Sequence, residues 1–593
     1  MRSPAFSIFT HTFNYHIYVD ARTLGHYRDR QVISGKPRHN AGLGHDIQGR
    51  FSVSARKLRT AARVGLVSAL LLGATAAPAQ NPLPHIQSHD GRHALIVDGA
   101  PFLMLGAQVN NSSAWPAMMP KVWPVIDQLH ANTVEVPIAW EQIEPKEGQF
   151  DFSYLDLLLT QARAHDVRLV LLWFGTWKNT GPAYAPSWVK LDNKRFPRMI
   201  GREGKVHYAL TPLARTTLEA DKKAFVALMR HLKEQDEANT VIMVQVENEA
   251  GTYGSARDHS PQADKLFAGQ VPAALLKKTG KQPGTWEQTF GRDAELMFHS
   301  WYVASYIGEI AAAGKAVKPL PMYANAALTS NPFVWQDPNT FASGGPSAGA
   351  IDAYKAAAPA LDIVSPDIYN PDHKQYLGWL DLYKRRDNPL FVPETGNAQA
   401  YARYFFPSIG RGAIGWSPFG MDDTKYFNFP LGAAKLDDVT IEMFARNYRL
   451  FQPMQREWAK LAYEGDVWGV AEPTDPDAKH TQSLDLGEHT ATITFGRGQF
   501  GTAPPTGNDQ PVGGVAIARL GPSEYLVTGY AARIDFGLAK PAGRNLMFDR
   551  VEEGHFDHGT WVFDRIWNGD QTDYGLNFTS VPQVLKVKLA TWP

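Results

Sequence analysis

The sequence of 593 residues contains no cysteine, which excludes disulfide bonds, thiolate catalysis and metal sites with Cys ligands. It has no net charge, with 59 basic and 59 acidic side chains, so nothing in the balance favours nucleic acid or an anionic membrane as a partner. It also lacks an H-E-x-x-H motif, and no G-x-G-x-x-G motif or P-loop follows any of the short apolar segments between residues 102 and 420. We therefore expect no cofactor and no metal.

Long apolar runs are scarce as well. Residues 64–73 form an apolar segment that is too short to span a bilayer; a basic region precedes it and a small-residue cleavage site follows. We expect residues 1–80 to be a leader and secretory signal cleaved after Ala79, giving a periplasmic or secreted protein with no membrane insertion. Because the signal begins late, a translation start at Val53 is a further hypothesis, which N-terminal sequencing of an unexported precursor would test.

Between residues 81 and 460 short apolar segments alternate with amphipathic helices. This alternation is typical of a parallel sheet, and eight repeats predict an α/β fold of the (β/α)₈ TIM-barrel type, with an open doubly wound sheet as the alternative. The expected strands are 102–109, 133–140, 168–175, 241–249, 321–327, 363–369, 390–396 and 412–420. Over 461–593, short alternating segments between Gly, Pro and Asp turns predict an all-β sandwich-like domain, which packs against the barrel or binds sugar.

Two of the expected strands end in carboxylates. Segment 241–250 reads VIMVQVENEA, and segment 390–396 repeats its pattern with Glu394. Glu249 would end the fourth strand and Glu394 the seventh, so both would reach one pocket from nearly opposite sides of the barrel. Strand alternation places Glu247 on the same face as Glu249 but one layer deeper, where we expect a buried supporting partner.

Paired carboxylates across a pocket suit glycoside hydrolysis, in which one protonates the leaving oxygen while the other stays ionised. Other residues at the strand ends are candidates for substrate binding, and each Trp among them has core packing as an equal alternative. Tyr369 is placed to hold Glu394 ionised by a hydrogen bond. The substrate-binding candidates are Asn248, Gln108, Trp140, Trp173, Tyr369 and Trp416.

These residues resemble the signature of the retaining (β/α)₈ glycosidases. Segment 245–251, QVENEAG, is similar to the acid/base motif of the family 35 β-galactosidases, and the segments 140–152 and 185–189 resemble two further motifs of that family. The resemblance implies that Glu249 is the general acid/base, Glu394 the nucleophile and Asn248 a galactose-binding residue. The second strand also resembles the family 42 β-galactosidases, whose Cys-ligated zinc has no ligands here. Three departures from the family 35 motifs, expected to border the sugar pocket, are Ala250, Glu141 and Ile143.

The expected function is that of an exo-acting retaining β-galactosidase that acts on oligosaccharides, including plant cell-wall side chains of xyloglucan or galactan. The alternatives are a β-glucosidase or α-L-arabinosidase of the same clan, a non-catalytic carbohydrate-binding barrel, and a metal-dependent hydrolase. A metal-dependent hydrolase would need metal ligands from the pairs Asp258-His259 and Asp372-His373, which we interpret as solvated loop residues. The sequence predicts no oligomeric state.

Overall fold

The computed structural model describes residues 82–475, 479–496 and 505–593. The leader, the signal and the cleavage site predicted within residues 1–80 lie outside these residues, as does the proposed start at Val53. Within the described part of the chain, no helix combines the length and the apolar character needed to cross a membrane.

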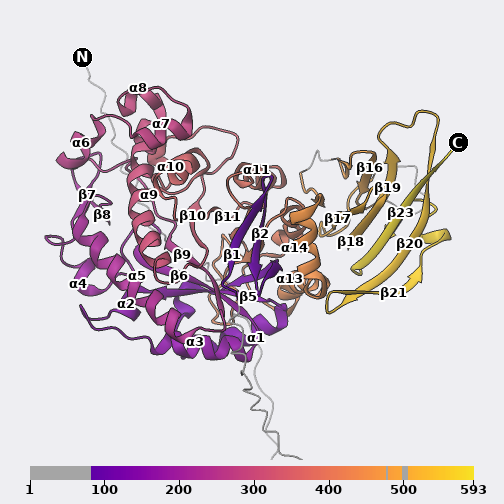
Figure 1. Ribbon diagram of the computed structural model, residues 1–593, viewed down its shortest axis with the longest axis horizontal. Coiled ribbons are helices and arrows are strands. Elements are labelled where there is room, and N and C mark those ends of the chain that lie inside the picture. Colours follow the sequence, from indigo (N-terminus) through magenta and orange to yellow (C-terminus); the bar gives the residue numbers. More distant parts are fainter. Residues whose placement is uncertain (1–81, 476–478, 497–504) are drawn as a thin grey trace, which may run out of the picture. The chain divides into compact units, whose positions relative to one another are not determined.

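The central feature is a closed barrel of eight parallel strands, which confirms the predicted (β/α)₈ fold (Figure 1). The strands follow one another around the barrel in chain order, and the observed bounds lie within a few residues of the predicted ones. They are β4 (Met104–Gln108), β5 (Thr133–Ala139), β6 (Arg168–Lys178), β9 (Val241–Asn248), β10 (Met322–Ala327), β11 (Ile363–Ile368), β12 (Val392–Thr395) and β13 (Gly415–Pro418).

The barrel strands are buried because side chains fill the interior and helices cover the outside. All eight residues of β9 are buried. Figure 1 shows α3, α5 and α9 beside the barrel strands, and α5 buries Leu218, Phe225 and Leu228 on one face, as its sequence pattern predicts. The helices outside the long loops after β6 and β9 include α1 (Met119–Leu129), α3 (Ser153–Ala164), α5 (Arg215–Gln235), α9 (Ala294–Lys315), α10 (Ile351–Ala357), α11 (His373–Tyr383), α12 (Phe405–Ile409), α13 (Asp438–Phe451) and α14 (Gln455–Glu464).

A small antiparallel sheet precedes the barrel. It consists of β1 (His85–His89), β2 (Arg92–Val97) and β3 (Ala100–Phe102). The turn between β2 and β3 is at Asp98 and Gly99, with φ values of 55° and 77°, as in a two-residue β-hairpin.

The long loops after β6 and β9 contain short elements of their own. Between β6 and α5 these are α4 (Ser187–Lys190), β7 (Arg198–Ile200) and β8 (Val206–Leu210). Between β9 and α9 they are α6 (Pro261–Phe267), α7 (Ala273–Thr279) and α8 (Trp286–Phe290). A single turn of helix, α2 (Trp140–Ile143), follows β5.

The C-terminal part forms two antiparallel sheets, as predicted. One has the order β14-β17-β18-β23-β20-β21 and the other β15-β16-β19-β22. Val527 from the first sheet and Ile493 and Ile534 from the second belong to one buried cluster, so the sheets pack face to face. The strands are β14 (Val467–Ala471), β15 (Thr481–Asp485), β16 (His489–Thr494), β17 (Gly514–Gly521), β18 (Glu524–Tyr530), β19 (Ala532–Leu538), β20 (Asn545–Asp557), β21 (Thr560–Ile566), β22 (Leu576–Phe578) and β23 (Gln583–Trp592).

The β sheets pack closely on the last helices of the barrel. A Cβ atom at Gly410 would lie 2.0 Å from the backbone nitrogen of Gly469, so only glycine permits this approach. Tyr530 donates a hydrogen bond of 2.9 Å to Asn447 on α13. These contacts agree with the predicted role of the β domain in packing against the barrel.

Candidate active site

A pocket of about 500 Å³ opens where the barrel strands end. Its residues come from the ends of β6, β10, β11 and β12, from the loops that follow β4, β6, β9, β10, β11 and β13, and from α11. The lining includes Asn111, Lys178, Asn179, Glu249, Tyr253, Leu328, Thr329, Asp367, Tyr369, Asn370, Trp379, Glu394, Phe419, Asn428 and Leu431. Another cavity of about 590 Å³ is lined by Arg92, Asp381, Arg411 and Asp466, whose charges pair with one another.

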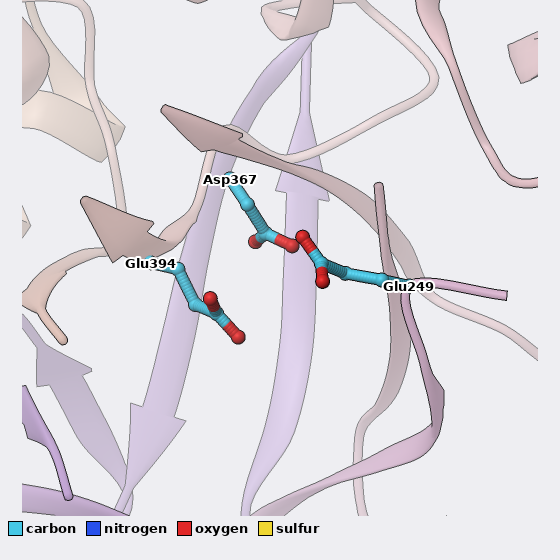
Figure 2. Close-up of side chains that lie close together, drawn as sticks. All are labelled: Glu249, Asp367 and Glu394. Carbon is cyan, nitrogen blue, oxygen red and sulfur yellow. The ribbon is translucent and has the colours of Figure 1, made fainter. Parts of the chain in front are cut away.

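Three carboxylates meet in the pocket. Glu249 follows β9, Asp367 is in β11 and Glu394 is in β12, and one oxygen of each lies within 4.8 Å of the others. Figure 2 shows the carboxyl groups of Glu249 and Asp367 pointing toward each other, with that of Glu394 beside them. Their exposed fractions are 9%, 3% and 4%. The structure therefore brings together the two acids that the sequence identified and adds a third.

Glu394 is held by three neutral donors. Tyr369 donates to Oε2 at 2.7 Å, and Gln108 donates to Oε1 at 2.9 Å, with the amide of Asn325 at 3.4 Å from the same oxygen. The predicted contact between Tyr369 and Glu394 is thus present, and Gln108 lies against the carboxylate. Burial and the charge of Glu249 raise the pKa of Glu394 to about 7, although Lys178 and the hydrogen bonds from Tyr369 and Gln108 act in the opposite direction.

The backbone at Glu249 has an unusual conformation. Its φ of 44° and the φ of 63° at Glu247 are in the left-handed region, which non-glycine residues rarely occupy. The backbone N–H of Glu249 donates to the side chain of Asn325 at 2.9 Å, and the Nζ of Lys178 lies 3.8 Å from Oε2. Such a backbone is common at functional sites, where surrounding contacts hold a residue in an unfavourable conformation.

Asp367 was missed by the sequence reasoning. Its position in β11 is level with Glu394 in β12, and its Oδ2 accepts a hydrogen bond of 2.8 Å from Asn325. Burial, the charges of Glu394 and Glu249, and a hydrogen bond with Glu249 raise its pKa well above the usual range. A charged residue inside the mostly apolar strand 363–368 was the signal available in the sequence, because a buried carboxylate is costly.

Glu247 is buried, as predicted, but strand alternation does not describe its direction. It accepts hydrogen bonds from the backbone N–H groups of Thr176 and Trp177, at 3.1 and 2.6 Å, and faces Asp221 on α5. The left-handed backbone at positions 247 and 249 turns the two side chains to different neighbours. Burial and the charge of Asp221 raise the pKa of Glu247 well above its ordinary value, as expected for a supporting group.

The three tryptophans expected to contact sugar are fully buried and do not line the pocket. Each uses its indole N–H inside the protein: Trp140 donates to Glu144 at 3.0 Å, Trp173 to Asp221 at 2.8 Å and Trp416 to Tyr376 at 3.0 Å. The core-packing alternative therefore describes them. The reason is that large aromatic side chains at strand ends fill the space between the barrel and its helices.

Asn248 is also fully buried and does not line the pocket, although it adjoins it. With its amide oxygen turned toward Lys178, it accepts a hydrogen bond of 3.1 Å from Nζ. The three departures from the family motif do not border the pocket either: Ala250 and Ile143 are buried, and Glu141 pairs with Lys190 at 2.8 Å.

The two Asp-His pairs are not solvated loop residues. Asp258 is buried and accepts hydrogen bonds from the backbone N–H groups of Ile200 and Ser260. Asp372 caps the N-terminus of α11, and the neighbouring His373 is buried, which lowers the pKa of its imidazole to about 4. Both pairs serve the packing of loops and helices.

Comparison with known proteins gives two matches to family models. Residues 113–310 match the family model described as "Beta-galactosidase", that of glycoside hydrolase family 42. This stretch is therefore similar to a family 42 domain. It includes Glu249 and ends before Glu394. The family 35 assignment is not confirmed, because the matching model is that of a related member of the clan. Residues 444–579 match a domain of unknown function (DUF5597).

A β-galactosidase of Xanthomonas manihotis is 26% identical over 232 residues, which cover 37% of this chain and 36% of that protein. The chain thus spans about a third of the length of this relative. The solved β-galactosidase of Bacillus circulans sp. alkalophilus has 15% identity and a TM-score of 0.43, covering 60% of this chain and 57% of that one. That of Rahnella sp. R3 has 16% identity and a TM-score of 0.45, covering 63% and 59%.

Proposed function

We propose that this protein is an exo-acting retaining β-galactosidase. The observation that carries the proposal is the meeting of Glu249 and Glu394 in one pocket at the ends of the barrel strands β9 and β12. Oxygens of the two groups lie within 4.8 Å of each other. Retaining glycosidases have carboxyl groups about 5–5.5 Å apart, whereas inverting enzymes need about 6.5–9.5 Å to admit a water molecule. The observed spacing supports attack by a carboxylate.

The reaction then has two displacement steps. Glu394 attacks the anomeric carbon and forms a glycosyl ester while the glycosidic C–O bond breaks and Glu249 gives its proton to the departing oxygen. Glu249, now ionised, takes a proton from water, whose oxygen attacks the same carbon and releases Glu394 as a carboxylate. Two inversions leave the product with the configuration of the substrate.

The surroundings of the two acids fit these roles. Tyr369 and Gln108 donate hydrogen bonds to Glu394, which orients its carboxylate and favours the ionised form. Lys178, 3.8 Å from Glu249, offers a positive charge that stabilises Glu249 after it has given up its proton. The first step requires one proton on this pair of buried carboxylates, carried by Glu249 while Glu394 is ionised.

The preference for galactose is supported by the family model and by the name of the Xanthomonas relative. We propose terminal β-D-galactose on plant cell-wall oligosaccharides, such as xyloglucan or galactan side chains, as the substrate, and export with cleavage after Ala79. A retaining β-glycosidase of the same clan with another sugar preference is the alternative, which a screen of aryl glycosides would decide.

The test is turnover of an aryl β-galactoside by the wild type, Glu249→Gln and Glu394→Gln. We expect activity in the wild type and a loss of at least a thousandfold with Glu394→Gln. Azide should rescue Glu394→Gly and give a glycosyl azide, and proton NMR should show the retained anomer first. A wild type that binds sugar without turnover would instead be a carbohydrate-binding barrel, and an inverted product would refute the role of Glu394.

The three carboxylates could also offer oxygens to a hard divalent cation. The glycosidase mechanism uses them in acid/base and nucleophilic roles, so we expect full activity after dialysis against a chelator. A loss of activity that returns with added cation would favour the metal-dependent alternative.

A further inference from the structure

The outer part of the pocket has exposed apolar side chains. Tyr253 and Leu431 both line it, with exposed fractions of 50% and 53%. Two residues before Leu431, Phe429 is 71% exposed. A single exposed apolar side chain needs no explanation, but several at the mouth of one pocket indicate a surface that a ligand covers.

Tyr253 is exposed on a fixed loop. The preceding residue, Thr252, pairs through its backbone with Ser343, with N–O distances of 2.7 and 3.1 Å, and the N–H of Gly254 donates to the carbonyl of Asn339 at 3.0 Å. Gly251 has a φ of 142°, and a Cβ atom there would lie 2.6 Å from the carbonyl oxygen of Ala342. Because these contacts fix the backbone on both sides, little conformational entropy is lost when a ligand packs on the ring.

Tyr253 also lies beside the proposed acid/base. It follows Glu249 by four residues, and both line the same pocket. Burial and the charge of Glu249 raise the pKa of the Tyr253 phenol. Since Glu249 would protonate the leaving oxygen, a side chain next to it faces the leaving group rather than the glycosyl unit that reacts with Glu394.

The other side of the mouth is formed by the loop after β13. Strands β9 and β13 are the fourth and eighth of the barrel, so the loops that follow them approach the pocket from opposite sides. The loop is tied to the barrel by Asn110, whose amide donates to the carbonyl of Tyr426 at 3.1 Å, and by Asn397, which accepts from the N–H of Ala433 at 2.8 Å. Leu431 is thus a second fixed apolar surface.

We propose that Tyr253 and Leu431 form a subsite for a pyranose ring on the leaving-group side of the cleaved bond. The apolar C–H face of a pyranose packs on an aromatic or aliphatic surface, while its hydroxyls reach polar groups at the edge. Asn179, Thr329 and Asn370 supply such groups around the same pocket. This inference rests on the proposed function and makes oligosaccharides, rather than glycosides with a small leaving group, the substrate class.

The experiment uses competition between two acceptors. The full-length enzyme is supplied with the β-glycosyl fluoride of the sugar that it releases, together with methyl β-D-glucopyranoside and methanol. Both acceptors compete for one glycosyl-enzyme, but only the first has a pyranose ring. The ratio of their transfer products does not depend on the fraction of enzyme that is folded.

We expect the wild type to favour the sugar acceptor over methanol at equal concentration. Tyr253→Ala should lower the product ratio by about two- to tenfold, and Leu431→Ala should lower it too, since each removes one packing surface. Tyr253→Phe keeps the ring and should retain the ratio. Tyr574→Ala, which removes a 45% exposed tyrosine from the loop before β22, is the matched control.

The outcomes separate the two proposals. A wild type that does not hydrolyse any β-glycosyl fluoride or aryl β-glycoside refutes the proposed function. A wild type that hydrolyses the fluoride but favours the sugar acceptor no more than methanol overturns the subsite. The same holds if Tyr253→Ala and Leu431→Ala give the ratio of the wild type.

Discussion

The raised pKa of Glu394 implies that its ionised side chain lowers the free energy of unfolding, by an amount that depends on pH. The pKa is about 7 in the folded protein, against an ordinary value of 4.5 for an exposed glutamate, and the side chain is 4% exposed. Between these values the unfolded chain has lost the proton that the folded protein keeps. Stability is therefore unaffected below about pH 4.5, falls as the pH rises through this window, and shows the full cost above about pH 7.

The size of the effect follows from the two pKa values. At about 1.36 kcal/mol per pKa unit, the difference corresponds to about 3 kcal/mol of unfolding free energy. Glu394→Gln removes the titration. Its amide can still meet both neighbours, because the Tyr369 hydroxyl also accepts a hydrogen bond and the amide oxygen accepts from Gln108. The inactive variant should therefore match the wild type near pH 4.5 and exceed it by up to about 3 kcal/mol above pH 7.

The assay is thermal unfolding of both proteins between pH 4.5 and 8.5. For a chain of this length that unfolds cooperatively, about 3 kcal/mol corresponds to a shift in Tm of about 3 °C. Glu234→Gln, at an exposed position on α5, is the control and should show no such pH-dependent gain. A difference between Glu394→Gln and the wild type that is the same at pH 5 and pH 8 would refute the reasoning.

Three further results are expected. Tyr369→Phe removes a hydrogen bond that lowers the pKa of Glu394, so the acidic limb of the profile of kcat/KM against pH should move to higher pH; an unmoved limb would contradict this. Asp367→Asn should keep more activity than Asp367→Ala, because the asparagine resembles the protonated acid beside Glu249, and equal losses in kcat/KM would show that the acid itself is needed. Trp140→Phe should lower the unfolding free energy by about 1–3 kcal/mol with KM unchanged, since the indole is buried and hydrogen-bonded. A raised KM in steady-state kinetics would show instead that Trp140 contributes to substrate binding.

The arrangement of the pocket also accounts for the long loop after β9. That loop supplies Tyr253 next to Glu249, while its backbone is fixed against residues 339–345 in the loop after β10. A loop of this length built around short helices is a means of placing a side chain at the pocket mouth without leaving it mobile. The leaving-group subsite would then be set by loops, whereas the two acids are set by strands.

The sequence by itself determined the barrel and its two principal acids. Apolar strands that alternate with amphipathic helices have few packing solutions, and the carboxyl ends of parallel strands in a closed barrel must meet at one rim. The positions of Glu249 and Glu394 at the ends of the fourth and seventh strands were therefore enough to place them in one pocket. Tyr369, at the end of the sixth strand, followed from the same count.

Only the tertiary structure decided which other strand-end residues reach that pocket. Trp140, Trp173 and Trp416 follow the same pattern as Tyr369, yet they are buried, because a large ring at a strand end can turn either to the pocket or to the packing between strand and helix. Asp367 lies in the site because its position in β11 is paired with Glu394 in β12. Glu247 points away from the site because its backbone is left-handed. Register, side-chain direction and backbone φ arise from contacts between distant segments, which linear patterns do not record.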